Sequence, residues 1–443
     1  MWHVQISKQR RRRQQQLQQH GRALLKRLER HQRQRRRWAW QATNMNDLHD
    51  GSFHAAISPV LVIAQCFGLM PVRGVRAATE RGLCFTRCSW RTWYSLLYIG
   101  AISFDALFAI NFALHGGLDM RSVEPIVFNG SILWASYQFL HLAHQWPQLM
   151  WRWARVEKHL PPYASWKERE QLARRIHSVA SILLSLSLME HLLSIISSVY
   201  HEVCPLRQDP VESYLYAVSA QFFHVFPYSN WLGWLGKLLN VLLTFGWNYI
   251  DLFVILVSIG LSHLLTRLTR QLQQLVERPM PEKFWTYVRT RYRSIVELIY
   301  DMDDAISGIM FISFGSNVYF ICLQLLKSIN EMPSTMHAVY FYFSLAFLIG
   351  RSLSVLLFVS AVHERARDPL RLLHLVPPSG YLSEVQRLAN ELSSDNVSLS
   401  GLRFFNVTRK LCLAVAGSIV TYELVLIQFH EDEKSWDCQA GKQ

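Results

Sequence analysis

Several ionisable and amide side chains lie within strongly apolar stretches of this 443-residue chain. Such groups are costly to bury in a membrane, so they either pair with one another or face a polar cavity. We place eight residues around one candidate ligand site: Glu190, His191, Trp247, Asn248, Asp251, Asn317, Tyr340 and Tyr342. Aromatic faces cover the C–H surfaces of a sugar while amides and carboxylates bond its hydroxyls. The pattern therefore predicts a sugar pocket, with mutual pairing or ordinary helix packing as the alternatives.

The sequence lacks the usual signatures of catalysis and of metal binding. It contains no glycine-rich phosphate loop, no His-Glu-x-x-His pair and no nucleophile elbow. Cys84 and Cys88 have neither a second cysteine pair nor nearby histidines. Asp105, Arg351 and Glu423 are further ionisable residues inside apolar stretches. We therefore expect no enzyme activity, no cofactor and no metal ion.

The elements that must position these side chains are long apolar helices. Half of the residues are apolar and only 18% are charged, a low share for a soluble protein. A bilayer-spanning helix needs about 20 mostly apolar residues. Seven stretches meet that need: 92–115, 127–146, 176–200, 236–264, 308–327, 338–362 and 410–429. The predicted fold is an all-α, polytopic membrane protein with seven transmembrane helices.

Basic residues lie almost entirely in alternate loops, which predicts the orientation of these helices. Of the 46 Lys and Arg residues, 38 fall in the following four segments: 1–91, 147–175, 265–307 and 363–409. Only 4 fall in the other loops and the C-terminal tail, and 4 lie inside the apolar stretches. Basic loops remain on the cytoplasmic side. Seven helices then place the N-terminus in the cytoplasm and the C-terminus outside.

Two N-terminal segments precede the first predicted span. Residues 54–72 are nearly long enough to span, but an eighth span would move every later basic loop outside. We therefore expect 54–91 to form an amphipathic or re-entrant segment at the cytoplasmic interface. The Arg/Gln-rich segment 1–53 is expected to be a basic cytoplasmic tail. Attraction to anionic lipid, or disorder, explains its composition better than an RNA-binding arm.

Three features are expected on the outer side. Asn129, with Ser131, forms a glycosylation sequon at the membrane surface. Acidic residues follow the last span, where several copies around an axis would favour cations, although a solubilising tail is the alternative. Cys204 and Cys438 either pair or remain free, since their separation is not known from the sequence.

The last span ends in a pattern that resembles a family signature. Thr421-Tyr422, then Glu423, and then Gln428-Phe429 after four hydrophobic positions resembles the closing signature of insect gustatory receptors. The likeness runs through almost the whole chain after about residue 46. Segments such as SLMEHLLSIIS (187–197), FPYSNWLGWLGK (226–237) and SGIMFISFGSN (307–317) are similar to the sugar-receptor branch.

This resemblance implies a ligand-gated, non-selective cation channel in the plasma membrane of gustatory neurons. It implies a disaccharide ligand, most specifically trehalose, and a homotetramer or a heteromer with other sugar receptors. Residues 92–362 would hold the sugar pocket and the cytoplasmic loops, and 363–409 would be a cytoplasmic anchor. Helix 410–429 would line a shared pore with Tyr422, Gln428 and Phe429, and 430–443 would be an extracellular tail.

Two other classes of membrane protein are possible alternatives. A seven-span, G-protein-linked sugar receptor would have its N-terminus outside and usually Asp/Glu-Arg-Tyr and Asn-Pro-x-x-Tyr signatures, which this chain lacks. A secondary transporter would show repeated halves and broken helices, and no such repeat is detected here.

Overall fold

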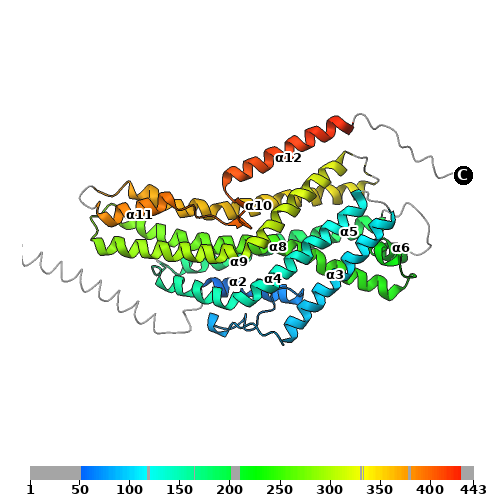
Figure 1. Cartoon of the computed structure of the whole chain (residues 1–443), viewed down its shortest axis with the longest axis horizontal. Coiled ribbons are helices and arrows are strands. Elements are labelled where there is room, and N and C mark those ends of the chain that lie inside the picture. The colour runs from blue at the N-terminus through cyan, green and yellow to red at the C-terminus, as the bar shows by residue number, and fades with distance from the viewer. Residues whose placement is uncertain are drawn as a thin grey trace, which may run out of the picture. The chain divides into compact units, whose positions relative to one another are not determined.

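The structure is a computed structural model that describes residues 51–116, 120–163, 165–200, 210–329, 332, 334–377 and 381–430. Most of these residues are helical (Figure 1). The helices are α2 (Phe53–Cys66), α3 (Trp90–Gly116), α4 (Met120–His159), α5 (Trp166–Tyr200), α6 (Pro210–Val218), α7 (Ala220–Phe223), α8 (Asn230–Leu275), α9 (Glu282–Ser328), α10 (Thr335–Leu373), α11 (Ser383–Ser394) and α12 (Arg409–His430), with a 3-10 turn, η2 (Glu80–Gly82). Two short strands, β1 (Ser400–Gly401) and β2 (Phe405–Asn406), pair antiparallel.

The predicted all-α membrane fold is confirmed. Within the described residues, five helices are long and apolar enough to cross a membrane: α3, α5, α8, α9 and α10. The other two predicted spans, 127–146 and 410–429, fall within α4 and α12. The count of seven spans and the orientation of the chain remain predictions.

Helix α8 forms the centre of the packed bundle. Every residue from Asn248 to Ser262 is buried, so the helix is enclosed on all sides rather than along one stripe. It packs against α10, α9, α5, α6 and α4. A helix that is apolar on all sides needs a protein or lipid environment around its full circumference. Here the neighbouring helices provide it, and the polar residues of α8 therefore face other side chains.

Helix α2 belongs to this core and is too short to be an eighth span. It has 14 residues, or about 21 Å at 1.5 Å per residue. Phe53, Ile57 and Leu61 are fully buried, and the Phe53 ring stacks on Trp153 with 4.0 Å between centroids. Helix α2 thus buries its apolar residues among other helices. The position of 54–91 at the cytoplasmic interface, as an amphipathic or a re-entrant segment, stays a prediction.

The predicted cytoplasmic segments 265–307 and 363–409 pack against each other. Arg289 of α9 donates from Nε to Glu384 Oε2 and from Nη1 to Glu391 Oε1, both at 3.0 Å. Asp303 accepts from the backbone N–H of Ser400 at 2.6 Å and from its hydroxyl at 2.8 Å. These bonds fasten α11 and β1 to the N-terminal half of α9. The N-terminal half of α9, α11 and β1 therefore form one packed unit that is continuous with the apolar part of α9.

Candidate functional site

A buried polar cluster joins α8, α9 and α10. The Asp251 carboxylate lies 2.7 Å from Arg351 Nε and accepts from Ser313 Oγ at 2.5 Å and from Asn317 Nδ2 at 3.0 Å. Arg351 also donates to Asn317 Oδ1 at 3.4 Å and to Asn248 Oδ1. The Asp251 and Arg351 side chains are each only 2% exposed. A buried ion pair of this kind is tolerated because surrounding hydrogen bonds satisfy both charges.

Three of the predicted ligand residues therefore come together, but they bind one another. Asn248, Asp251 and Asn317 direct their polar atoms at Arg351 and at neighbouring groups. This is the mutual pairing that the sequence left open as an alternative to a polar cavity. Their hydrogen-bonding groups are occupied, so direct contact with a sugar would require this cluster to open. We interpret the cluster as a connector between three helices.

Trp247 connects this cluster to an aromatic group. The Arg351 guanidinium carbon lies 5.3 Å from the centroid of the Trp247 ring, within the range of a cation–π contact. The same indole packs edge-to-face on Phe320 at 4.8 Å and lies 5.6 Å from Phe128. Aromatic pairs in these geometries add stability beyond the area that they bury. The Trp247 side chain therefore contacts both Phe320 and Arg351, so a movement of Phe320 would change the surroundings of Arg351.

Glu190 and His191 lie on α5 beside two neighbouring helices. Ser344 of α10 donates to Glu190 Oε1 at 2.6 Å and accepts from Gln324 of α9 at 3.2 Å. His191 Nε2 lies 3.4 Å from Lys237 Nζ of α8, and the same ammonium donates to Asn240 Oδ1 at 3.3 Å. Both predicted residues are thus engaged in polar contacts between helices.

The two predicted tyrosines lie on different sides of α10. Tyr340 is half-buried beside the His337 ring, with 6.2 Å between centroids. Tyr342 is 54% exposed. Residues two apart on an α-helix point in nearly opposite directions. The two side chains therefore do not face the same side of α10, and the role of both tyrosines in a sugar pocket stays a prediction.

A cavity of about 360 Å³ lies at the junction of α3, α4, α6, α7, α8 and α9. Its wall combines acidic and amide side chains with aromatic rings. The polar members are Asp105, Ser122, Glu124, Asn129, Gln221 and Asn240, and the aromatic members are Phe112, Phe128, Phe222 and Phe320. Carboxylates and amides beside ring faces are the chemistry that polyhydroxylated ligands require. The volume lies at the lower end of the range for small-ligand sites.

Asp105 organises the polar wall of the cavity. Its Oδ1 accepts from Gln221 Nε2 and its Oδ2 accepts from Asn129 Nδ2, both at 2.9 Å. The residue is 4% exposed and joins helices α3, α4 and α7. A ligand hydroxyl could bond the remaining lone pairs of the carboxylate without breaking this arrangement.

None of the eight predicted ligand residues lines the cavity directly. Two of them connect to residues that do: Trp247 packs on Phe320, and Lys237 lies between His191 and Asn240. Sequence reasoning did single out Asp105 as an ionisable residue in a span. Gln221 carried no signal, because it lies in a short helix between two spans and its role depends on folding back toward α3.

Asn129 and one predicted pore residue lie in the described part of the chain. The Asn129 side chain is 2% exposed and its amide donates to Asp105 Oδ2, and its glycosylation stays a prediction. Tyr422 is 39% exposed on α12. The side chains of Gln428 and Phe429 lie outside the described residues, as do Cys204, Cys438 and all of 431–443. Their predicted roles are not tested.

This arrangement of helices matches a fold known from solved membrane proteins. The fold is similar to the solved insect olfactory receptor OR5 from Machilis hrabei in complex with eugenol, with a TM-score of 0.66 and 14% identity. A second structure of OR5 gives a TM-score of 0.65 and 15% identity. Each match covers 84% of this chain and 97% of the solved chain. The likeness shows that the chain has an insect olfactory receptor-like fold.

Sequence comparison gives the family. A family model described as "Trehalose receptor" matches residues 12–438, and the chain belongs to that family. It is 65% identical over 398 residues to "Gustatory receptor 5a for trehalose" of Drosophila melanogaster, with 90% of each chain covered. It is 45% identical over 392 residues to the same fly's "Gustatory receptor for sugar taste 64f", covering 88% of this chain and 84% of that one. The chain is therefore a receptor rather than an enzyme.

Proposed function

We propose that this protein is a gustatory receptor that binds trehalose and opens a cation channel in the plasma membrane of taste neurons. The observation that carries the proposal is the 65% identity, over 90% of both chains, to a fly receptor named for trehalose. Identity over nine-tenths of both chains supports a shared ligand class and a shared mode of action. The fold, which is that of an insect olfactory receptor, supports the same class.

The cavity beside Asp105 is the best candidate for the sugar site. It offers Asp105, Asn240 and Gln221 to bond hydroxyls, and Phe128 and Phe320 to cover the C–H faces of a pyranose ring. A disaccharide has hydroxyls on both rings, which suits polar groups contributed by α3, α7 and α8. The predicted cluster around Asp251 then acts behind the site rather than in it.

A route for coupling runs from the cavity to α10. Phe320 lines the cavity, Trp247 packs on Phe320, and Arg351 of α10 lies over Trp247. A sugar that presses on Phe320 would change the packing of α10, which is in contact with α12. The ligand must bind the open arrangement more tightly than the closed one, because equal affinity shifts no equilibrium.

Helix α12 is the proposed pore helix. It presents exposed apolar side chains, including Leu413 at 76% and Val420 at 59%. Such a surface on one chain suits contact with lipid or with other copies. We propose that four subunits, either identical or mixed with other sugar receptors, bring Tyr422, Gln428 and Phe429 to a common pore. The acidic tail 430–443 would favour cations at its outer mouth, and the basic tail 1–53 would lie near anionic lipid.

Alanine substitution in the cavity tests the proposal. Asn240→Ala removes one hydrogen-bonding group from the wall, and the loss of a bond worth about 1 kcal/mol raises the half-maximal trehalose concentration roughly fivefold. Asn390→Ala changes an exposed amide on α11, far along the chain from the cavity lining, and should leave the curve unchanged. The measurement is trehalose-evoked current in cells expressing the receptor.

The same recordings separate the proposed site from the proposed function. If the trehalose dose–response curve is unchanged in both Asn240→Ala and Gln221→Ala, the cavity is not the sugar site. The proposal that the protein is a trehalose receptor would still stand. Currents in excised patches without GTP are expected for a channel. Responses that require GTP would instead support the G-protein-linked alternative.

A further inference from the structure

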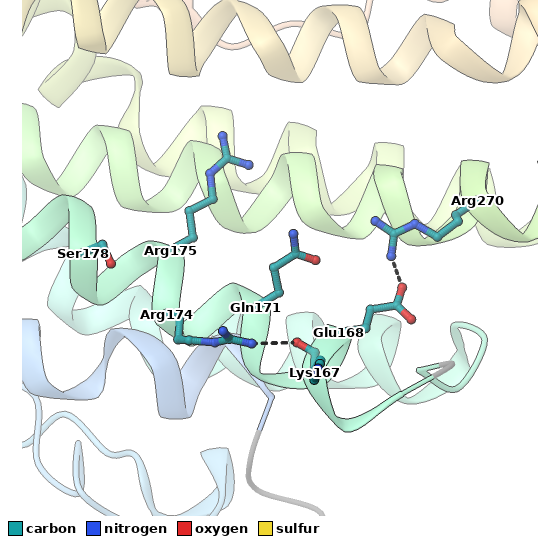
Figure 2. A pocket seen from close by; sticks show the side chains of 7 residues that line it. All are labelled: Lys167, Glu168, Gln171, Arg174, Arg175, Ser178 and Arg270. Atoms are coloured by element: carbon teal, nitrogen blue, oxygen red, sulfur yellow. Dashed lines mark hydrogen bonds and ion pairs between the residues drawn. The ribbon is translucent and has the colours of Figure 1, made fainter.

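A second hollow lies where α5 begins and α8 ends, away from the sugar cavity. It has a volume of about 630 Å³. Figure 2 shows the side chains that line it: Lys167, Glu168, Gln171, Arg174, Arg175, Ser178 and Arg270. Six of these come from α5 and one, Arg270, from α8. Four cations therefore face one hollow that contains a single carboxylate.

The positive charge of the hollow is not neutralised by the chain. Glu168 is already paired with Arg270 (Figure 2). Arg174 donates to the Lys167 carbonyl at 3.2 Å, and its Nε lies 3.9 Å from Glu170 Oε2 in an exposed pair that contributes little. Neither Lys167 nor Arg175 forms an ion pair with any carboxylate among the described residues. The hollow thus presents several N–H donors to an anion from outside.

The surroundings of the hollow indicate where that anion is found. Trp166, the first residue of α5, is 65% exposed, and tryptophan at a helix end is typical of the membrane interface. Beyond Ser178, α5 exposes apolar side chains, with Ile182 at 59% and Leu188 at 61%. The adjacent face of α10 exposes Leu357 at 58%, and Arg175 lies over the Phe358 ring at 5.4 Å. A charged hollow thus continues into an apolar helix surface.

We propose that this hollow binds the headgroup of an anionic phospholipid that carries several phosphates on its headgroup, such as a phosphorylated phosphatidylinositol. Arginine presents planar pairs of donors that match phosphate oxygens, and Lys167 adds a point charge. Basic pockets between membrane helices on the cytoplasmic side suit such headgroups. The acyl chains would lie along the apolar faces of α5 and α10, which a soluble phosphate would leave unused.

The position of the hollow gives this lipid a route to the sugar site. Helix α5 carries Glu190 and His191, and α8 carries Lys237 and Asn240 at the cavity. A headgroup held by Arg175 of α5 and Arg270 of α8 would tie the two helices together at their cytoplasmic ends. The binding itself does not depend on which sugar opens the receptor.

Binding of a short-chain lipid to the purified full-length receptor tests the proposal. The probes are dioctanoyl phosphatidylinositol bisphosphate, inositol trisphosphate and dioctanoyl phosphatidylcholine. The variant is Lys167→Gln with Arg175→Gln, both at exposed positions, so that the fold is retained. The control, Arg35→Gln with Arg36→Gln, removes the same charge from the N-terminal tail. We expect the first pair to weaken binding of the bisphosphate lipid at least tenfold and the control to change it less than twofold.

The other outcomes each contradict the proposal in a different way. If both variants bind the bisphosphate lipid equally well, the hollow is not the lipid-binding site. A greater loss in the tail variant would assign lipid binding to residues 1–53 instead. Inositol trisphosphate binding as tightly as the lipid, with the same loss in the first variant, would mean that the hollow takes a soluble phosphate. A melting temperature that is unchanged from the parent protein confirms that Lys167→Gln with Arg175→Gln is folded.

Discussion

The Arg351–Asp251 pair is the residue-scale feature with the clearest energetic consequence. Removing one partner leaves the other charged and buried, which costs about 3–5 kcal/mol. We therefore expect Arg351→Met to lower the melting temperature of the purified receptor sharply. Arg365→Met makes the same change on the same helix at an exposed pair with Asp368, and should cost less than about 1 kcal/mol.

A double variant separates the charge effect from lost packing. Arg351→Met combined with Asp251→Leu removes both charges, and replacing a buried pair by apolar residues is often neutral. We expect the double variant to recover most of the melting temperature. A double variant as unstable as Arg351→Met alone would contradict the view that the unpaired carboxylate causes the loss.

The burial of Glu157 leads us to expect that the stability of the fold depends on pH. This residue lies near the C-terminal end of α4, outside the predicted span 127–146. Removal of its carboxyl group from water raises its pKa to about 7, although hydrogen bonds from the Phe53 N–H and Trp153 Nε1 and the charge of Arg267 oppose the rise. The fold thus favours the protonated form. The resulting stability is fully present below about pH 4.5, the ordinary pKa of glutamate, and is lost as pH rises through about 7.

Melting curves at different pH values test this assignment. We expect the melting temperature to fall between pH 5 and pH 8, with a contribution of at most roughly 3 kcal/mol. Glu157→Gln should flatten that part of the profile, whereas Glu297→Gln, at an exposed position on α9, should not. An unchanged profile in Glu157→Gln would exclude this carboxyl group as the cause.

At this scale the sequence identified which residues are unusual but not what each one contacts. The cost of charge in apolar segments singled out Asp105, Asp251 and Arg351. Their partners depend on helix rotation, and one turn more or less decides whether a side chain meets a cavity or another side chain. This is why the sequence did not show that Tyr340 and Tyr342 lie on different sides of α10, and why Gln221 was missed.

At the scale of elements, the close approach of α2 to α8 at Gly260 is a packing feature that a single substitution can test. A Cβ on Gly260 would lie 2.6 Å from Phe53 ring atoms and 2.8 Å from Trp153. We expect Gly260→Ala to push α2 outward and to cost about 1–3 kcal/mol of stability. Gly315→Ala on α9 has nothing within 4 Å of the added Cβ and should be neutral or slightly stabilising. Equal melting temperatures for the two variants would contradict this packing.

Helix positions could be predicted from the sequence better than helix lengths. Apolar stretches located α3, α5, α8, α9 and α10, but 236–264 became Asn230–Leu275 because backbone hydrogen bonds continue beyond the apolar segment. The burial of α2 could not be predicted in the same way. It depends on Trp153 and Gly260, which lie about 100 and 200 residues further along the chain.

At the scale of the whole molecule, loop charge and family membership support one account. The alternation of basic loops predicts a cytoplasmic N-terminus, and the comparisons place the chain among trehalose receptors with an insect olfactory receptor-like fold. The family could be predicted from the sequence because the likeness extends along almost the whole chain. The cavity proposed as the sugar site could not be predicted, since its wall is assembled from six helices between α3 and α9.

The most direct test is a recording from cells that express this chain alone or with a second sugar receptor. Trehalose, sucrose, maltose and glucose are applied to the outside, and whole-cell current is measured with and without GTP in the pipette. The account predicts an inward cation current that is largest for trehalose and independent of GTP. No current with trehalose in either setting, from receptor shown to be at the cell surface, would contradict the proposed function.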